Sequence, residues 1–98
     1  MSAVVLFEFP SGKIDVRSWI LDHAAILTIA GTAELQFAGT EQTKSGKTGV
    51  ETIALAFASI ECASSTLSEW RQDSGFPACV ETRLLRTECV PLPDVIFP

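Results

Sequence analysis

The sequence predicts an α+β fold, mainly an antiparallel β-sheet of about five strands with one short helix. Three observations predict it. Residues 3–9 are rich in branched and aromatic side chains, as strands are. Two further stretches with alternating apolar residues flank a polar, glycine-bearing segment, which is the pattern of a hairpin. Residues 65–73 carry helix start and stop signals.

The predicted hairpin spans residues 26–62 and is the longest feature of the chain. Side chains of a strand alternate between two faces, so residues of equal parity share a face. The polar segment 40–49 is expected to form the exposed tip. The first arm places Leu27, Ile29, Ala33, Leu35 and Phe37 on one parity; the second sets Ile53, Leu55 and Phe57 against Thr52, Ala54, Ala56 and Ala58.

The segment after the first strand allows two interpretations. Pro10, Ser11 and Gly12 are turn residues, so residues 13–17 are expected to form a second strand, followed by a short helical turn over 18–25. The alternative is a longer helix capped by Asp15 and stopped by Gly31. Its apolar stripe would be Val16, Trp19, Ile20, His23, Leu27 and Ala30.

Residues 50–61 also fit a helix, since Val50, Ile53, Phe57 and Ile60 fall at helical spacing. Strands are favoured here, and the helical version of both stretches gives the alternative order β-α-β-α-β. The helix over 65–73 is expected to be capped by Ser65 or Thr66 and to end at Ser74 and Gly75.

Residues 79–90 alternate and predict the last strand. The tail 91–98 contains three prolines, which cannot donate to a sheet, and is expected to be extended. At 98 residues the chain is expected to be a single compact domain, 1–98.

Charge excludes some partners. Seven basic against twelve acidic residues give a net charge of −5, which argues against nucleic acid and anionic membranes as partners. No apolar run is long enough for a membrane span, and the N-terminus lacks the pattern of a signal peptide. We therefore expect a cytoplasmic protein.

Motifs for catalysis, metals and cofactors are not found. Residues 39–48 end like a phosphate-binding loop, but Glu41 stands where that motif requires glycine. One histidine, His23, and three scattered cysteines give no metal-ligand spacing. Cys62, Cys79 and Cys89 are expected to be reduced thiols, with a Cys62–Cys79 disulfide as the alternative. No catalytic residue, metal or cofactor is predicted.

A weak ligand-binding set is Arg71, Arg83 and Arg86, which would meet if the helix packs near the last strand. Trp70 and His23 complete this set. Pairing of the arginines with Glu69, Glu81 or Glu88 is the competing interpretation.

Two features point to a protein partner instead. Val95, Ile96 and Phe97 form an apolar chain end that would serve as a dimerisation arm, and Trp19 is a candidate interface anchor. The alanine-rich parity of residues 52–58 offers a smooth face that can receive a second sheet.

We therefore expect a small non-enzymatic protein that binds other proteins, as a homodimer, with its acidic charge favouring basic partners. The alternative function is a small-ligand binder or minor enzyme with a pocket between sheet and helix, near Trp70, Cys62 and the arginines.

Overall fold

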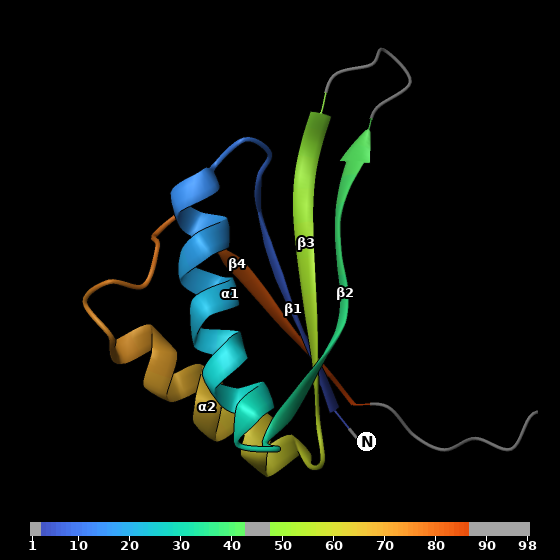
Figure 1. The fold of residues 1–98 in the computed structure, drawn as a ribbon, viewed down its shortest axis with the longest axis vertical. Helices are drawn as coiled ribbons and strands as arrows, with labels where there is room; N and C mark the ends of the chain where they lie inside the picture. The colour runs from blue at the N-terminus through green and yellow to red at the C-terminus, as the bar shows by residue number, and fades with distance from the viewer. Residues whose placement is uncertain (1–2, 43–47, 87–98) are drawn as a thin grey trace, which may run out of the picture.

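The computed structural model describes residues 3–42 and 48–86 (Figure 1). These residues form four strands and two helices in the order β-α-β-β-α-β. The elements are β1 (Ala3–Pro10), α1 (Ile14–Ile29), β2 (Ala33–Gln42), β3 (Thr48–Phe57), α2 (Ile60–Gln72) and β4 (Glu81–Arg86).

All neighbouring strands are antiparallel, in the sheet order β2-β3-β1-β4. The first and third strands therefore lie at the centre, and the second and fourth at the edges. This arrangement of two split β-α-β units is the ferredoxin-like topology.

Both helices cover the same face of the sheet (Figure 1). The core lies between these two layers. Its largest fully buried side chains come from both central strands and from α1: Val5, Phe7, Ile20, Ile53, Leu55 and Phe57. The α+β class and the antiparallel sheet are thus as the sequence predicted.

The number of elements differs from the prediction of about five strands and one helix. Residues 13–17 are not a strand, and the helical turn expected over 18–25 belongs to the 16-residue helix α1. Val16, Ile20 and Ala24 are buried along one side of this helix, at the spacing of one helical face. Asp15 lies in its first turn, while Lys13 occupies the N-cap position.

Gly31 ends α1 in the way the alternative interpretation expected. Its φ is +75°, a left-handed conformation that glycine adopts without steric cost. The next amide, of Thr32, donates to the carbonyl oxygen of Leu27 at 2.8 Å and closes the helix end. Residues 26–29 are therefore helical, and the hairpin arm begins at Ala33.

The second helix begins earlier than predicted, at Ile60, so residues 60–62 do not belong to the hairpin. Ser59, rather than Ser65 or Thr66, is the N-cap, because its hydroxyl accepts a hydrogen bond from the Cys62 amide at 3.1 Å. Helix α2 turns Ala63, Leu67 and Trp70 towards the sheet, and all three are buried.

The hairpin itself is confirmed in its central part, where β2 pairs with β3. The last strand, β4, is shorter than the predicted 79–90, since it begins at Glu81 and the structure describes it to Arg86. Lys44 and Lys47 of the predicted tip, Cys89, and the tail with Val95, Ile96 and Phe97 lie outside the described residues.

Candidate functional site

The sheet face opposite the helices is the most prominent candidate surface. The strand register shows which side chains share it, because directly opposed residues point to the same face. We call it the open face. It consists of Val4, Leu6, Glu8, Pro10, Glu34, Phe37, Gly39, Val50, Thr52, Ala54, Ala56, Glu81, Arg83 and Leu85.

The open face has a low centre between higher edges. Ala54 lies between Leu6 on β1 and Phe37 on β2, and Ala56 lies beside Val4. Both alanines are buried by these taller neighbours, although no helix covers them. Towards the edges, Phe37 is 55% and Leu85 is 45% exposed. The centre of the open face is therefore made of small apolar side chains, with larger apolar side chains beside them.

A β-bulge places Phe37 on the open face. Leu35 pairs with Leu55, but Phe37 pairs with Ala54, so β2 carries one extra residue, Gln36, between them. Such an extra residue reverses which side of the sheet the following side chains take. The sequence parity put Leu35 and Phe37 on one face; the structure places them on opposite faces.

Charged side chains on the open face lie mostly at the end towards the hairpin tip. Arg83 donates from Nε to Oε1 of Glu8 at 2.7 Å, across the β1–β4 pair. Arg83 is therefore paired, as the competing interpretation held, but with Glu8 rather than with Glu69, Glu81 or Glu88.

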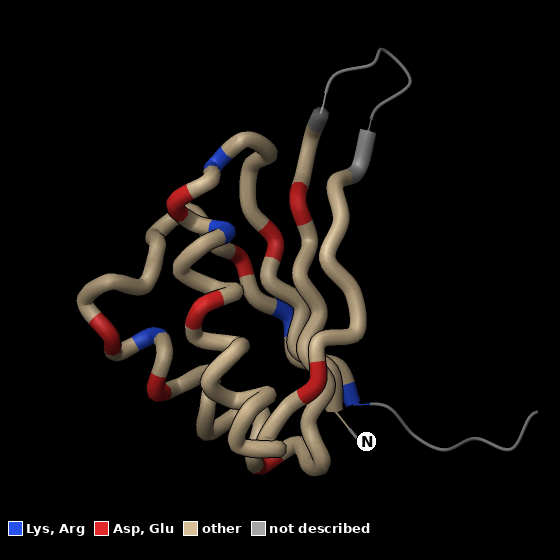
Figure 2. Tube along the Cα trace, in the orientation of Figure 1, with Lys and Arg blue, Asp and Glu red and all other residues tan. Residues whose placement is uncertain are grey.

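The three arginines of the predicted ligand-binding set do not converge. Arg71 donates a hydrogen bond to the Thr82 hydroxyl on the helix side of the sheet, whereas Arg83 points to the open face. Arg86 lies near the other end of β4. The Lys and Arg positions of the described chain are dispersed rather than gathered on one surface (Figure 2).

His23, Trp19 and Trp70 lie together in an aromatic cluster between the two helices. The His23 ring stacks on Trp19 with a centroid distance of 3.7 Å, and Trp19 meets Trp70 edge-on at 5.6 Å. The His23 Nδ1 is 2.7 Å from the carbonyl oxygen of Trp19, and its Nε2 is 4.0 Å from the Asp73 carboxylate. These contacts hold α1 against α2. Trp19, expected at an interface, is half-buried among them.

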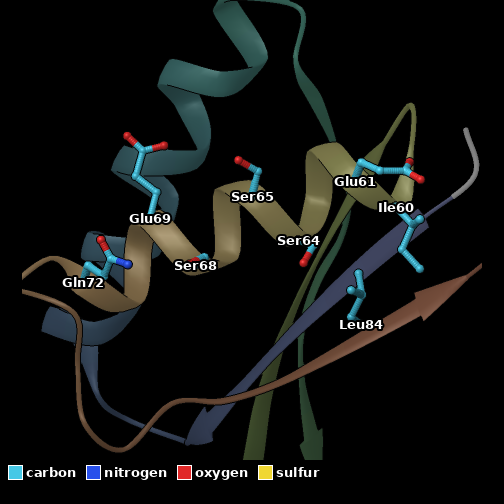
Figure 3. A pocket seen from close by; sticks show the side chains of 8 residues that line it. All are labelled: Ile60, Glu61, Ser64, Ser65, Ser68, Glu69, Gln72 and Leu84. Carbon is cyan, nitrogen blue, oxygen red and sulfur yellow. The ribbon is translucent and has the colours of Figure 1, made fainter.

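A groove of about 710 Å³ runs between α2 and β4 (Figure 3). Ser64 points towards it from the helix, Leu84 extends into it from the strand, and Ser68 also lines it. The carboxylate of Glu69 points away from β4. Trp70, Cys62 and the arginines do not line this groove, so it is not the pocket that the sequence suggested.

A smaller cavity of about 210 Å³ contains a charged pair that the sequence analysis did not single out. Arg17, from the first turns of α1, donates from Nε to Oε2 of Glu51 at 3.1 Å and from Nη2 to Oε1. The Glu51 side chain is only 5% exposed. The hydrogen bonds and the charge of Glu51 raise the pKa of Arg17 above its usual range.

Among residues 3–42 and 48–86, no three His, Cys, Asp or Glu side chains gather as a metal site would require. Cys62 and Cys79 are free thiols in this part of the chain, and Cys79 precedes β4 instead of lying in it. Neither described helix has the length and apolar character needed to cross a lipid bilayer.

No protein-family model matches the chain, and no curated protein sequence matches it. Several solved structures are similar to it, including the following two. An uncharacterized NIPSNAP domain protein from Burkholderia xenovorans has a TM-score of 0.45 and 15% identity, covering 89% of this chain and 95% of that one. A putative antibiotic biosynthesis monooxygenase from Deinococcus radiodurans has a TM-score of 0.43 and 8% identity, covering 97% and 99%. Both similarities are low, in sequence and in structure.

Proposed function

We propose that this chain is a non-enzymatic protein-binding protein that assembles as a homodimer through its open face. The carrying observation is the apolar centre of that face, which neither helix covers. Exposure of a large apolar side chain such as Phe37 to water is unfavourable, by about 25 cal/mol for each Å² of surface. Burying this face against another protein surface therefore stabilises the complex.

The shape of the open face favours a second copy of the same chain as the partner. In a twofold interface the same patch faces itself, so it must contain both a projection and a recess for it. In this interface Phe37 is the projection, and the small side chains of Ala54 and Ala56 provide the recess. Two sheets stacked about 10 Å apart interdigitate their side chains in this manner.

The charges of the open face fit the same arrangement. The apolar centre has Arg83 and Glu8 beside it, and these two already neutralise each other within one chain. This pair therefore brings no net charge to the recess; Glu34, opposite Ala56, and Glu81, opposite Glu8, are further acidic side chains of the same face. The acidic net charge of the chain, −5, favours a basic protein as the next partner of the assembled dimer.

The test is the solution mass by light scattering, for the chain and for two variants of β2. Phe37→Glu places a charge on the open face, and Leu35→Glu places the same charge on the opposite face of the same strand. Leu35 is 48% exposed, a fraction close to the 55% of Phe37, so the two substitutions are matched. We expect a dimer for the chain and for Leu35→Glu, and a folded monomer for Phe37→Glu.

A monomeric parent chain, or a dimer that survives Phe37→Glu, would contradict the proposal. A version ending at Val90 separates the contribution of Val95, Ile96 and Phe97, which remains a prediction from the sequence. If that version is a monomer while Phe37→Glu is still a dimer, assembly depends on the tail and not on the open face.

A further inference from the structure

The cavity beside Arg17 and Glu51 lies on the helix side of the sheet, at the end of the molecule where α1 begins. Its floor is formed by β2 and β3, and Arg17 stands at its side. Its lining residues are Arg17, Ala38, Gly39, Thr40, Glu51, Thr52 and Ile53. Gly39 and Thr52 are also positions of the open face, whereas the other five lining residues belong to the helix side, and none of the seven lines the groove between α2 and β4.

Glu51 is the most deeply buried carboxylate among the described residues. Withdrawing a carboxylate from water costs several kcal/mol, which one partner rarely offsets in full. Each oxygen of Glu51 accepts one described hydrogen bond, and both come from Arg17. A carboxylate can accept about four. Acceptor capacity therefore remains at a group that lines the cavity and is almost closed to solvent.

Arg17 is the complementary half of the site. Its side chain is 44% exposed, and its bonds to Glu51 use Nε and Nη2. The second terminal nitrogen, Nη1, carries two further hydrogens that a guanidinium donates in the same plane. The cavity is thus lined by one residue with remaining acceptor capacity and one with remaining donor capacity, and their ion pair holds the two together.

The charge of the pair restricts the ligand. Arg17 and Glu51 neutralise each other, so a cation that approaches Glu51 meets the guanidinium, and an anion that approaches Arg17 meets the carboxylate. A neutral ligand with adjacent hydroxyl groups avoids both repulsions, because a hydroxyl both donates and accepts. Ala38 and Ile53 provide aliphatic wall for the carbon atoms of such a ligand.

We propose that this cavity binds a small neutral polyol, with one hydroxyl donating to Glu51 and a neighbouring hydroxyl accepting from Arg17. The site is separate from the homodimer proposed above, since it lies on the other side of the sheet. Binding of the polyol to Arg17 and Glu51 therefore does not depend on whether the chain is a monomer or a dimer.

The experiment is an NMR titration of the ¹⁵N-labelled full chain with three small hydroxyl-bearing probes: erythritol, ethanolamine and glycolate. They are a neutral polyol, a cation and an anion. We expect saturable amide shifts with erythritol in the millimolar range, centred on Gly39, Thr40 and Thr52. Glu51→Gln should weaken binding at least about tenfold, since it removes an acceptor oxygen and the charge. Glu69→Gln, on the surface of α2, is the matched control.

Three outcomes overturn the proposal. The first is the absence of saturable shifts with erythritol, which leaves Arg17 and Glu51 as a structural ion pair only. The second is tighter binding of ethanolamine or glycolate, which contradicts the neutral ligand class. The third is unchanged erythritol binding by folded Glu51→Gln. If that variant does not fold, Arg17→Lys replaces it, because it keeps the charge and removes the planar donor; unchanged binding by Arg17→Lys likewise overturns the proposal.

Discussion

Replacing Phe37 by alanine gives the most quantitative test of the homodimer. A phenylalanine side chain has roughly 200 Å² of surface, and 55% of Phe37 is exposed, so each subunit has about 110 Å² to bury. Two subunits bury about 220 Å² of Phe37 surface, which at 25 cal/mol for each Å² sets an upper value of about 5 kcal/mol. Alanine retains a methyl group, and area overstates affinity in protein interfaces. We therefore expect a loss of about 3 kcal/mol, or a roughly 100-fold higher Kd.

The assay is sedimentation equilibrium over a concentration series, which gives the dimer Kd directly. Leu35→Ala is the control, since it removes a similar exposed side chain from the same strand and should leave the Kd unchanged. Equal effects of the two substitutions would show that β2 is perturbed generally. An unchanged Kd for Phe37→Ala would refute the role of the open face.

Three further predictions concern Gly39, the N-cap of α2 and the core. A Cβ added at Gly39 would lie 2.5 Å from Cζ of Phe37, so Gly39→Ala must displace that ring. We expect the variant to weaken the dimer about tenfold without lowering monomer stability. An unchanged dimer Kd in sedimentation equilibrium would contradict this. Ser59→Ala removes the N-cap bond to Cys62 and should cost about 1 kcal/mol in urea unfolding, and full stability would show that the cap is dispensable. Leu55→Ala empties a fully buried position and should cost about 2–5 kcal/mol by the same assay, whereas a loss below 1 kcal/mol would contradict its burial.

Local sequence patterns predicted the strands better than the helices. The first strand has only one reasonable interpretation, since residues 3–9 are branched and aromatic with a turn after them. In α1, by contrast, residues 27–29 satisfy the strand alternation and the helical stripe equally well. In the structure the helix is favoured by burial, because Val16, Ile20 and Ala24 pack into the core along one side of it. That contact is between distant parts of the chain, so no local pattern contains it.

The candidate sites show the same limit. The shift of Phe37 to the open face depends on one extra residue, Gln36, whose effect is visible only once β2 is aligned with β3. Glu51 is one of twelve acidic residues, and its partner Arg17 is 34 positions away. A signal was present, since Glu51 shares the parity of the apolar Ile53 and Leu55. An acidic residue on a buried parity requires a partner or a ligand.

The central position of β1 has a consequence for how this protein is made. Strand β1 is synthesised before both strands it pairs with, β3 on one side and β4 on the other. At about 5–20 residues per second, the second of these partners is complete roughly 4–15 s after β1. During that interval at least one edge of an apolar strand is unpaired, and such an edge is an aggregation hazard. The sheet therefore cannot be completed until β4, which the structure describes to Arg86, has been synthesised.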